Sequence, residues 1–123
     1  RLPIVLSMTC LDGYWYFPTG NSLTESLVRA GNGGAVATFS PTGLGVATGH
    51  HIILDGFMRS VLRHEARVLG QATMAGKLAL FATGQSDDLI NTFMIVGDPA
   101  LRLPVLPVDI SSEQVYLPLV HAP

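Results

Sequence analysis

The fold is decided near the start of the chain, by Pro3-Ile4-Val5-Leu6-Ser7-Met8-Thr9-Cys10-Leu11-Asp12-Gly13. The first six of these residues are mostly apolar, with β-branched residues in the middle, which predicts a buried strand over Pro3–Met8. The Asp12-Gly13 pair is typical of a turn. The single cysteine of the chain, Cys10, therefore lies where a buried strand gives way to a turn.

A capped helix and a second strand are expected after this turn. Ser22 and Glu25 have the spacing of a capping box, in which each side chain bonds the other residue's backbone N–H, and Gly31 is a natural stop. Ala35–Phe39 is small and apolar and is interpreted as a second buried strand. Strand, helix and strand in about 40 residues predict a parallel βαβ crossover. The helix is expected to bury one apolar face, made of Leu23, Leu27 and Ala30.

Further helices and one more strand are predicted downstream. Ser40–Gly49 is expected to be a loop because it is rich in Gly, Thr and Pro. Helices are expected from His50 or Ile52 to Val68, over Leu69–Ala82 and, as a short turn, over Asp87–Phe93. A last core strand is expected over Met94–Val96, and prolines break up residues 104–123, which are interpreted as a linker or extended tail. The apolar face of the longest helix is expected to contain Ile53, Phe57, Val61 and Leu62.

Composition excludes several classes of function. The chain has 123 residues, of which 48% are hydrophobic and 13% charged, with a net charge of -2. The seven basic residues are scattered, so no patch for nucleic acid or anionic lipid is expected. The apolar blocks are shorter than the roughly 18 to 20 residues of a membrane span. One cysteine excludes an internal disulfide and a Cys-rich zinc site. The apolar opening without an initiator Met indicates a fragment or a processed chain.

Cys10 is the candidate nucleophile. The carboxyl end of a strand in an α/β sheet is where reactive groups gather, and backbone N–H groups in the following turn could face a developing oxyanion. The alternative is that Cys10 is a small buried apolar residue, which is the usual environment of a free cysteine. The aromatic run Tyr14–Phe17 could line a substrate pocket or pack in the core.

A cysteine nucleophile needs an imidazole partner, and the chain offers four histidines. His50 and His51 follow the Gly-rich loop and are expected at the same sheet edge as Cys10, either as polar residues of a helix start or as a replacement base. His64 is interpreted as a solvated group and His121 lies in the tail. No third ligand has a suitable spacing, so zinc is not expected, and no other cofactor is indicated.

The ordered segments resemble the gingipain family of cysteine peptidases over roughly residues 3–103. The resemblance rests on the Cys10 turn (residues 7–13), on Ser22-Leu23-Thr24-Glu25-Ser26-Leu27-Val28 and on Gly33-Gly34-Ala35-Val36-Ala37. It also rests on Lys77-Leu78-Ala79-Leu80 and on Gly97-Asp98-Pro99-Ala100-Leu101-Arg102-Leu103. The Cys-x-x-Gly turn by itself is a weak signal, whereas the ordered series is fairly specific.

The resemblance implies a caspase-like three-layer α/β/α sandwich with a mostly parallel sheet, of which residues 1–103 form the C-terminal part. It implies peptide-bond hydrolysis by a Cys–His dyad with Cys10 as nucleophile and a possible lining role for Ser40, Pro41 and Thr42 in the substrate pocket. The family histidine lies in an upstream His-Gly segment that this sequence lacks. The implied partners are therefore a peptide substrate and the upstream half of the same domain. A secreted or bacterial cell-surface location is also implied.

Two readings from other classes stay open on the sequence. The chain could be a non-catalytic interaction or scaffolding module that keeps the fold after losing the active site. It could also be a generic α/β domain that binds a small ligand at the strand edge.

Overall fold

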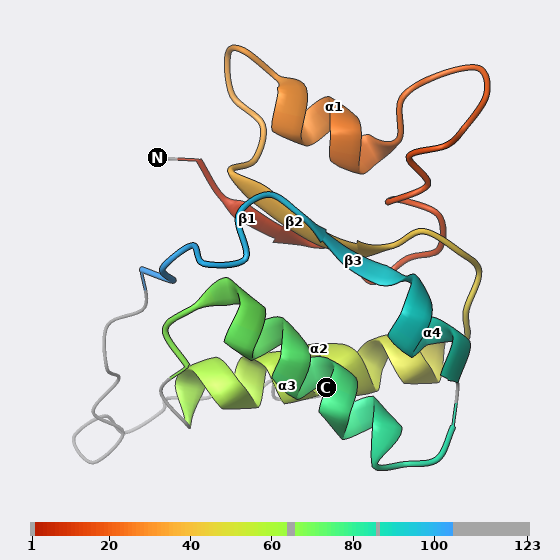
Figure 1. Cartoon of the computed structure of the whole chain (residues 1–123), viewed down its shortest axis with the longest axis vertical. Helices are drawn as coiled ribbons and strands as arrows, with labels where there is room; N and C mark the ends of the chain where they lie inside the picture. Colours follow the sequence, from red (N-terminus) through yellow and green to blue (C-terminus); the bar gives the residue numbers. More distant parts are fainter. Residues whose placement is uncertain (1, 64–65, 86, 105–123) are drawn as a thin grey trace, which may run out of the picture.

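Helices cover both faces of a three-stranded sheet in the computed structural model, which describes residues 2–63, 66–85 and 87–104. Helix α1 lies on one face of the sheet, and α2 and α3 lie on the other (Figure 1). This arrangement confirms the α/β/α class. In chain order the elements are β1 (Ile4–Leu6), α1 (Leu23–Arg29), β2 (Ala37–Pro41), α2 (Ala47–Leu62), α3 (Leu69–Phe81), α4 (Asp87–Thr92) and β3 (Phe93–Val96).

The sheet is mixed rather than mostly parallel in the part that the structure describes. Strand β1 pairs with β2 in parallel, with Leu6 opposite Phe39, as the predicted crossover requires. Strand β3 is antiparallel to β2, with Pro41 opposite Phe93. The reason is local, because α4 leads directly into β3, and β3 begins at the end of the sheet where β2 stops. The last residue of β2 and the first residue of β3 therefore lie side by side.

Helix α1 forms as expected but buries a different face. Both hydrogen bonds of the capping box between Ser22 and Glu25 are present. Leu23, however, is 51% exposed, whereas Thr24 is buried and its hydroxyl lies 2.6 Å from that of Ser40 in β2. The predicted apolar face is thus wrong, since α1 meets the sheet through hydroxyl groups.

The boundaries of the middle elements shift by a few residues. Strand β2 starts two residues later than predicted and continues to Pro41, while α2 starts at Ala47. Helix α2 also ends earlier than predicted, at Leu62, and Val68 instead forms an isolated antiparallel bridge with Arg102. Three of its four predicted core residues are buried, and Leu62 is exposed. Helix α3 agrees with the prediction to within one residue. The expected tail over 104–123 lies, apart from its first residue, outside the described residues.

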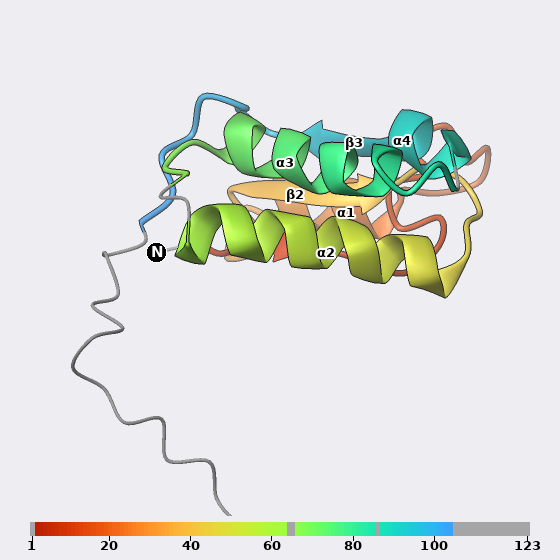
Figure 2. The same cartoon turned by 90° about the horizontal axis from the view of Figure 1, so that it is seen from below.

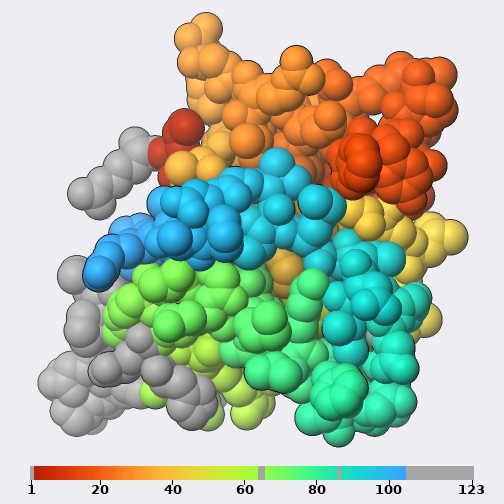
Figure 3. Space-filling view, viewed as in Figure 1, coloured from red at the N-terminus to blue at the C-terminus, as the bar shows by residue number. Residues whose placement is uncertain are grey.

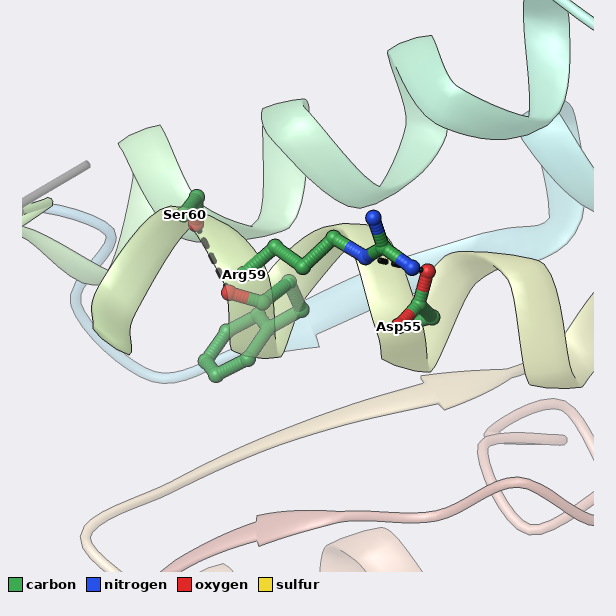
Figure 4. A network of polar contacts seen from close by, with 4 residues as sticks. Asp55, Arg59 and Ser60 are labelled. Carbon is green, nitrogen blue, oxygen red and sulfur yellow. Dashed lines mark hydrogen bonds and ion pairs between the residues drawn. The ribbon is translucent and has the colours of Figure 1, made fainter. Parts of the chain in front are cut away.

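Helices α2 and α3 lie side by side beneath the sheet (Figures 1 and 2). Their close approach depends on small residues, because a Cβ on Gly76 of α3 would lie 2.5 Å from the Ile53 carbonyl oxygen of α2. The surface of α2 carries an exposed ion pair between Asp55 and Arg59, with a separation of 2.7 Å (Figure 4). Glycine therefore sets the distance between the two helices.

Two apolar clusters fill the space between the sheet and these helices. The second cluster lies under the edge where β1 and β2 end, and its Phe39 and Phe93 rings have centroids 5.0 Å apart. Met8 packs against this cluster from the segment after β1. The core thus supports the segment that carries Cys10. The second cluster consists of Phe39, Ile53, Leu80, Leu89 and Phe93.

Candidate functional site

The candidate site lies where β1 and β2 end and α2 begins. Strand β1 ends at Leu6, and the Ser7 N–H donates to the Phe39 carbonyl at 3.0 Å, which extends the pairing by one residue. Cys10 follows in a turn and is half-buried. In the space-filling view, the red-orange segment that continues from this turn stands at the surface beside α1 (Figure 3). The expected location of Cys10 just beyond the end of a strand is therefore seen in the structure.

The turn that holds Cys10 is sharply bent and tied to β2. Leu11 has a φ of 66°, the left-handed region that a residue with a branched side chain rarely adopts. Its N–H donates to the Gly43 carbonyl at 3.3 Å, and the Gly13 N–H donates to the Pro41 carbonyl at 2.9 Å. Two backbone bonds thus hold a strained backbone in place on either side of Asp12, and strain of this kind gathers at functional sites.

Asp12 closes the base of the turn. Its carboxylate accepts a hydrogen bond from the Ser7 hydroxyl, and its carbonyl accepts from the Thr24 N–H at 3.0 Å. The first contact joins the end of β1 to the turn, and the second joins the turn to the start of α1. The Cys10 turn is therefore fastened to three elements.

The Cys10 thiol faces the start of α2. Its Sγ donates to the Gly45 carbonyl oxygen at 3.4 Å, and Gly45 directly precedes Val46, the N-cap residue of α2. Val46 has no side chain that caps the helix. The start of α2 thus lies close to the sulfur.

Gly45 cannot be replaced by a larger residue without displacing its neighbours. A Cβ there would lie 2.1 Å from Cδ2 of Leu89 in α4 and 3.1 Å from Nε2 of His50. In the sequence, Gly43-Leu44-Gly45 is a weak signal for a phosphate-binding loop, but in the structure Gly45 allows close packing beside Cys10. Sequence reasoning missed this packing role, although the spacing of the two glycines could have indicated it.

His50 and His51 lie in the first turn of α2 in different environments. His50 is 3% exposed, and its Nδ1 lies 2.9 Å from the Met8 carbonyl oxygen. Its Nε2 is buried and has no hydrogen-bond partner among the described residues, so no hydrogen bond joins this ring to Cys10. His51 is exposed. His64 and His121 lie outside the described residues.

The three predicted substrate-binding residues differ in accessibility. Ser40 and Pro41 belong to β2 and are fully buried, and the Ser40 hydroxyl contacts that of Thr24. Thr42 is half-buried, and its hydroxyl donates to the Thr92 carbonyl at 3.1 Å. Thr42 is therefore the most accessible of the three, and the lining role of all three stays a prediction.

An aromatic group follows the Cys10 turn and is mostly exposed. Trp15, Tyr16 and Phe17 are each at least half exposed, so the core-packing alternative is wrong for them. The Tyr14 ring stacks edge-on against Tyr16 and Phe17. A pocket of about 460 Å³ lies beside this group, lined by Leu11, Tyr14, Phe17, Asn21, Ser22 and Leu44. Sequence reasoning missed Leu11 and Leu44 as lining residues.

Two further observations concern metals and membranes. Within residues 2–63, 66–85 and 87–104, no three His, Cys, Asp or Glu side chains gather closely enough to hold a metal ion. No helix in the same part of the chain is long and apolar enough to cross a membrane.

Comparison with solved structures and sequence families identifies the architecture. The chain superposes on the Arg-specific cysteine proteinase gingipain R (RgpB) with a TM-score of 0.76 and 24% sequence identity, over 84% of this chain and 26% of that chain. It superposes on the complex of Porphyromonas gingivalis RgpB pro- and mature domains with a TM-score of 0.75 and 23% identity, over 82% of this chain and again 26% of that chain. The chain thus spans about a quarter of the gingipain chains that it matches.

These likenesses show the gingipain fold and confirm the α/β/α class. No curated protein matches the chain. The sequence profile described as peptidase family C25 matches residues 1–104, most of the chain. The chain therefore belongs to peptidase family C25, the gingipain-like cysteine peptidases.

Proposed function

We propose that the chain is the nucleophile-bearing part of a cysteine endopeptidase. The Cys10 thiolate attacks the carbonyl carbon of a peptide bond and forms a thioester acyl-enzyme, and the leaving amine takes a proton from a histidine. Water then attacks the thioester, which releases the carboxylic acid and restores the thiol. The histidine is supplied by an upstream segment of the same domain.

One observation carries this proposal: in a chain of family C25, Cys10 lies at the end of a strand in a strained, heavily anchored turn. The left-handed Leu11 turns the chain sharply just after the thiol, and the uncapped start of α2 lies beside the sulfur. The arrangement favours a thiol held ready for reaction.

The Cys10 backbone N–H is the best candidate for stabilising the oxyanion. The N–H groups of Leu11 and Gly13 already donate to carbonyls of the neighbouring loop and strand, so they are not free for substrate. No hydrogen bond from the Cys10 N–H to another described residue is present. An N–H on the residue that carries the nucleophilic sulfur has the place that an oxyanion donor needs.

The missing base supports an upstream partner segment. His50 is engaged with Met8 and His51 makes no hydrogen bond to the thiol, so neither provides the dyad within the described residues. Strand β1 has a partner on one side only there, and an apolar groove of about 590 Å³ runs beside its free edge. We propose that the upstream half of the domain extends the sheet at β1, covers this groove and brings the histidine.

The proposal extends to substrate contacts, domain limits and location. The pocket beside Tyr14 and Phe17 offers an apolar surface next to the nucleophile. Thr42 lies two residues before Leu44, which lines this pocket. Residues 1–103 would form the C-terminal part of the peptidase domain and 104–123 a linker. By resemblance to gingipains, the protein acts outside the cell or on the bacterial surface.

Active-site labelling tests the proposal directly. The longer parent protein that the proposal requires is treated with a varied panel of peptidyl acyloxymethyl ketones and analysed by mass spectrometry. A covalent adduct on Cys10, absent from the Cys10→Ala variant, is expected. Failure of every probe to modify Cys10 in a folded parent protein counts against an endopeptidase.

The 123-residue chain alone is expected to be inactive, because the proposed base is carried by an upstream segment. Peptide hydrolysis by the purified chain that Cys10→Ala abolishes would contradict this expectation. It would instead favour a dyad built from this chain's own histidines.

A scaffolding module is the second candidate, and the lack of a histidine bonded to Cys10 in the described residues favours it. The sequence upstream of Arg1 in the parent gene separates the two. A His-Gly segment after a predicted strand favours the peptidase, and its absence favours the scaffold.

A further inference from the structure

We propose that His50 is a positioning residue for the nucleophile and not its base. Its imidazole clamps the segment between β1 and Cys10 by donating from Nδ1 to the Met8 carbonyl. This inference rests on the proposed role of Cys10 as a nucleophile. It assigns a separate task to a residue that would otherwise be a candidate for the dyad.

The direction of the hydrogen bond follows from chemistry. A backbone carbonyl only accepts hydrogen bonds, so the His50 Nδ1 that lies 2.9 Å from the Met8 oxygen must carry a proton. In the neutral ring the other nitrogen, Nε2, then has a lone pair and no proton. Within the part of the chain that the structure describes, that Nε2 is buried without a hydrogen-bond partner and lies near Gly45.

The ring is held rigidly in this orientation. His50 is only 3% exposed, and its ring stacks edge-on against Phe93 with ring centroids 5.4 Å apart. Phe93 in turn packs on Phe39 in the core cluster under the sheet edge. Because the ring is fixed by the core, its bond to Met8 fixes the chain two residues before the thiol.

The same ring also bears on the acceptor of the thiol. A Cβ on Gly45 would lie 3.1 Å from His50 Nε2, and the Gly45 carbonyl accepts the hydrogen bond from Cys10 Sγ. His50 therefore bonds the segment that delivers Cys10 and lies near the loop whose carbonyl receives the S–H, with room for no side chain at Gly45. Loss of the clamp should loosen the contact between Sγ and the Gly45 carbonyl.

Thiol alkylation measures this loosening on the chain itself, because Cys10 is its single cysteine. His50→Phe keeps a packed ring but removes the donor, whereas His50→Asn keeps an N–H close to the Nδ1 position. We expect iodoacetamide to modify Cys10 about three- to tenfold faster in H50F, the effect of one net hydrogen bond, and H50N to stay within about twofold of the unmodified chain. His51→Phe and His51→Asn, at the exposed neighbour, are the matched controls and should leave the rate unchanged.

Equal alkylation rates for the folded H50F variant and the unmodified chain would overturn the proposal, and so would equal rates for H50F and H50N. Circular dichroism establishes whether each variant is folded. A second measurement needs no variant: long-range ¹H–¹⁵N correlation spectra of the unmodified chain report which ring nitrogen carries the proton. A His50 ring protonated at Nδ1, with a slowly exchanging proton, is expected, and a ring protonated only at Nε2 would overturn the proposal even if H50F does not fold.

These outcomes are independent of the labelling experiment on the parent protein. A clamp present without any ketone adduct on Cys10 means that the endopeptidase proposal fails and the positioning geometry stands. An adduct on Cys10 together with an unaltered alkylation rate in H50F means that the endopeptidase proposal stands and the positioning role of His50 fails.

Discussion

Single residues at the candidate site are held by contacts with residues far away in the sequence, some later in the chain and some earlier. Cys10 contacts Gly45, thirty-five positions later, and His50 contacts Met8, forty-two positions earlier. These long-range contacts place two loop segments against each other at atomic precision. The thiol is therefore positioned by tertiary structure, and the local Cys-x-x-Gly turn supplies only the bend.

The left-handed backbone of Leu11 has a measurable cost. An asparagine adopts this conformation more readily than leucine, so Leu11→Asn should stabilise the chain by about 0.5 to 1 kcal/mol. The measurement is the free energy of unfolding in urea. Leu44→Asn is the control, because Leu44 is also exposed and lines the same pocket but has no positive φ. Equal effects of the two substitutions would show that strain at Leu11 is not the cause.

Lys77 on α3 gives the stability a pH dependence. Partial burial lowers the pKa of its ammonium below the ordinary 10.5. The unfolded chain therefore binds more protons than the folded chain between the lowered pKa and 10.5, and stability contributed by this group rises with pH across that window. Below the window the charged form carries a desolvation penalty.

We therefore expect Lys77→Met to raise the thermal midpoint at pH 7 by a few degrees at most, since more than half of the group is solvated. The gain should shrink as the pH approaches 10.5. Arg63→Met, an exposed cation that does not titrate in this range, is the control and should show no such trend. A gain from Lys77→Met that is the same at pH 7 and pH 10 would contradict the explanation.

At the scale of the elements, one capped helix start was predictable and the buried faces were less so. The capping box at Ser22 follows from local chemistry, so the sequence predicts it well. The start of α3 agrees with the prediction, whereas both ends of α2 differ from it by several residues. The face that α1 buries depends instead on Thr24 meeting the hydroxyl of Ser40, a partner on another element. The antiparallel direction of β3 and the burial of His50 likewise depend on packing that no local pattern encodes.

The capping box of α1 can be tested with a matched pair on one helix. Ser22→Ala removes the side chain that accepts from the Glu25 N–H and should cost about 1 kcal/mol. Ser26→Ala changes an exposed position inside the same helix and should change stability by less than about 0.5 kcal/mol. Urea unfolding of both variants provides the comparison. A loss for S22A no larger than that for S26A would mean that the cap contributes nothing.

The contact between α2 and α3 makes a stronger prediction. A methyl group at Gly76 would lie 2.5 Å from the Ile53 carbonyl oxygen, so Gly76→Ala must push the helices apart. We expect a loss of about 1 to 3 kcal/mol of stability, despite the higher helix propensity of alanine. Gly31→Ala is the control, because no atom lies within 4 Å of the added methyl group. Thermal unfolding of both variants measures the difference, and a stabilised G76A would refute the close-packing explanation.

At the scale of the whole molecule, the sheet has two edge strands among the described residues, β1 and β3. Strand β1 is an edge strand, and the groove beside it is lined by apolar residues from β1, α2 and the segment after Leu101. Leu2, Val36, Met58 and Leu62 are each at least 40% exposed along this groove. An edge strand beside a large apolar surface is a site for further chain to pair and pack.

The proposed upstream half should therefore bind at this groove. Leu62→Lys would place a charge in the proposed interface and should weaken reconstitution of peptidase activity from the two separately expressed halves by at least about tenfold in Kd. Leu78→Lys is the matched control, because Leu78 is 58% exposed on α3 and does not line the groove, so reconstitution should be unchanged. Hydrogen exchange adds a readout that needs no activity, since pairing should protect backbone amides of β1 in the mixture. If L62K and L78K reconstitute equally well and β1 gains no protection, the groove is not where the two halves meet.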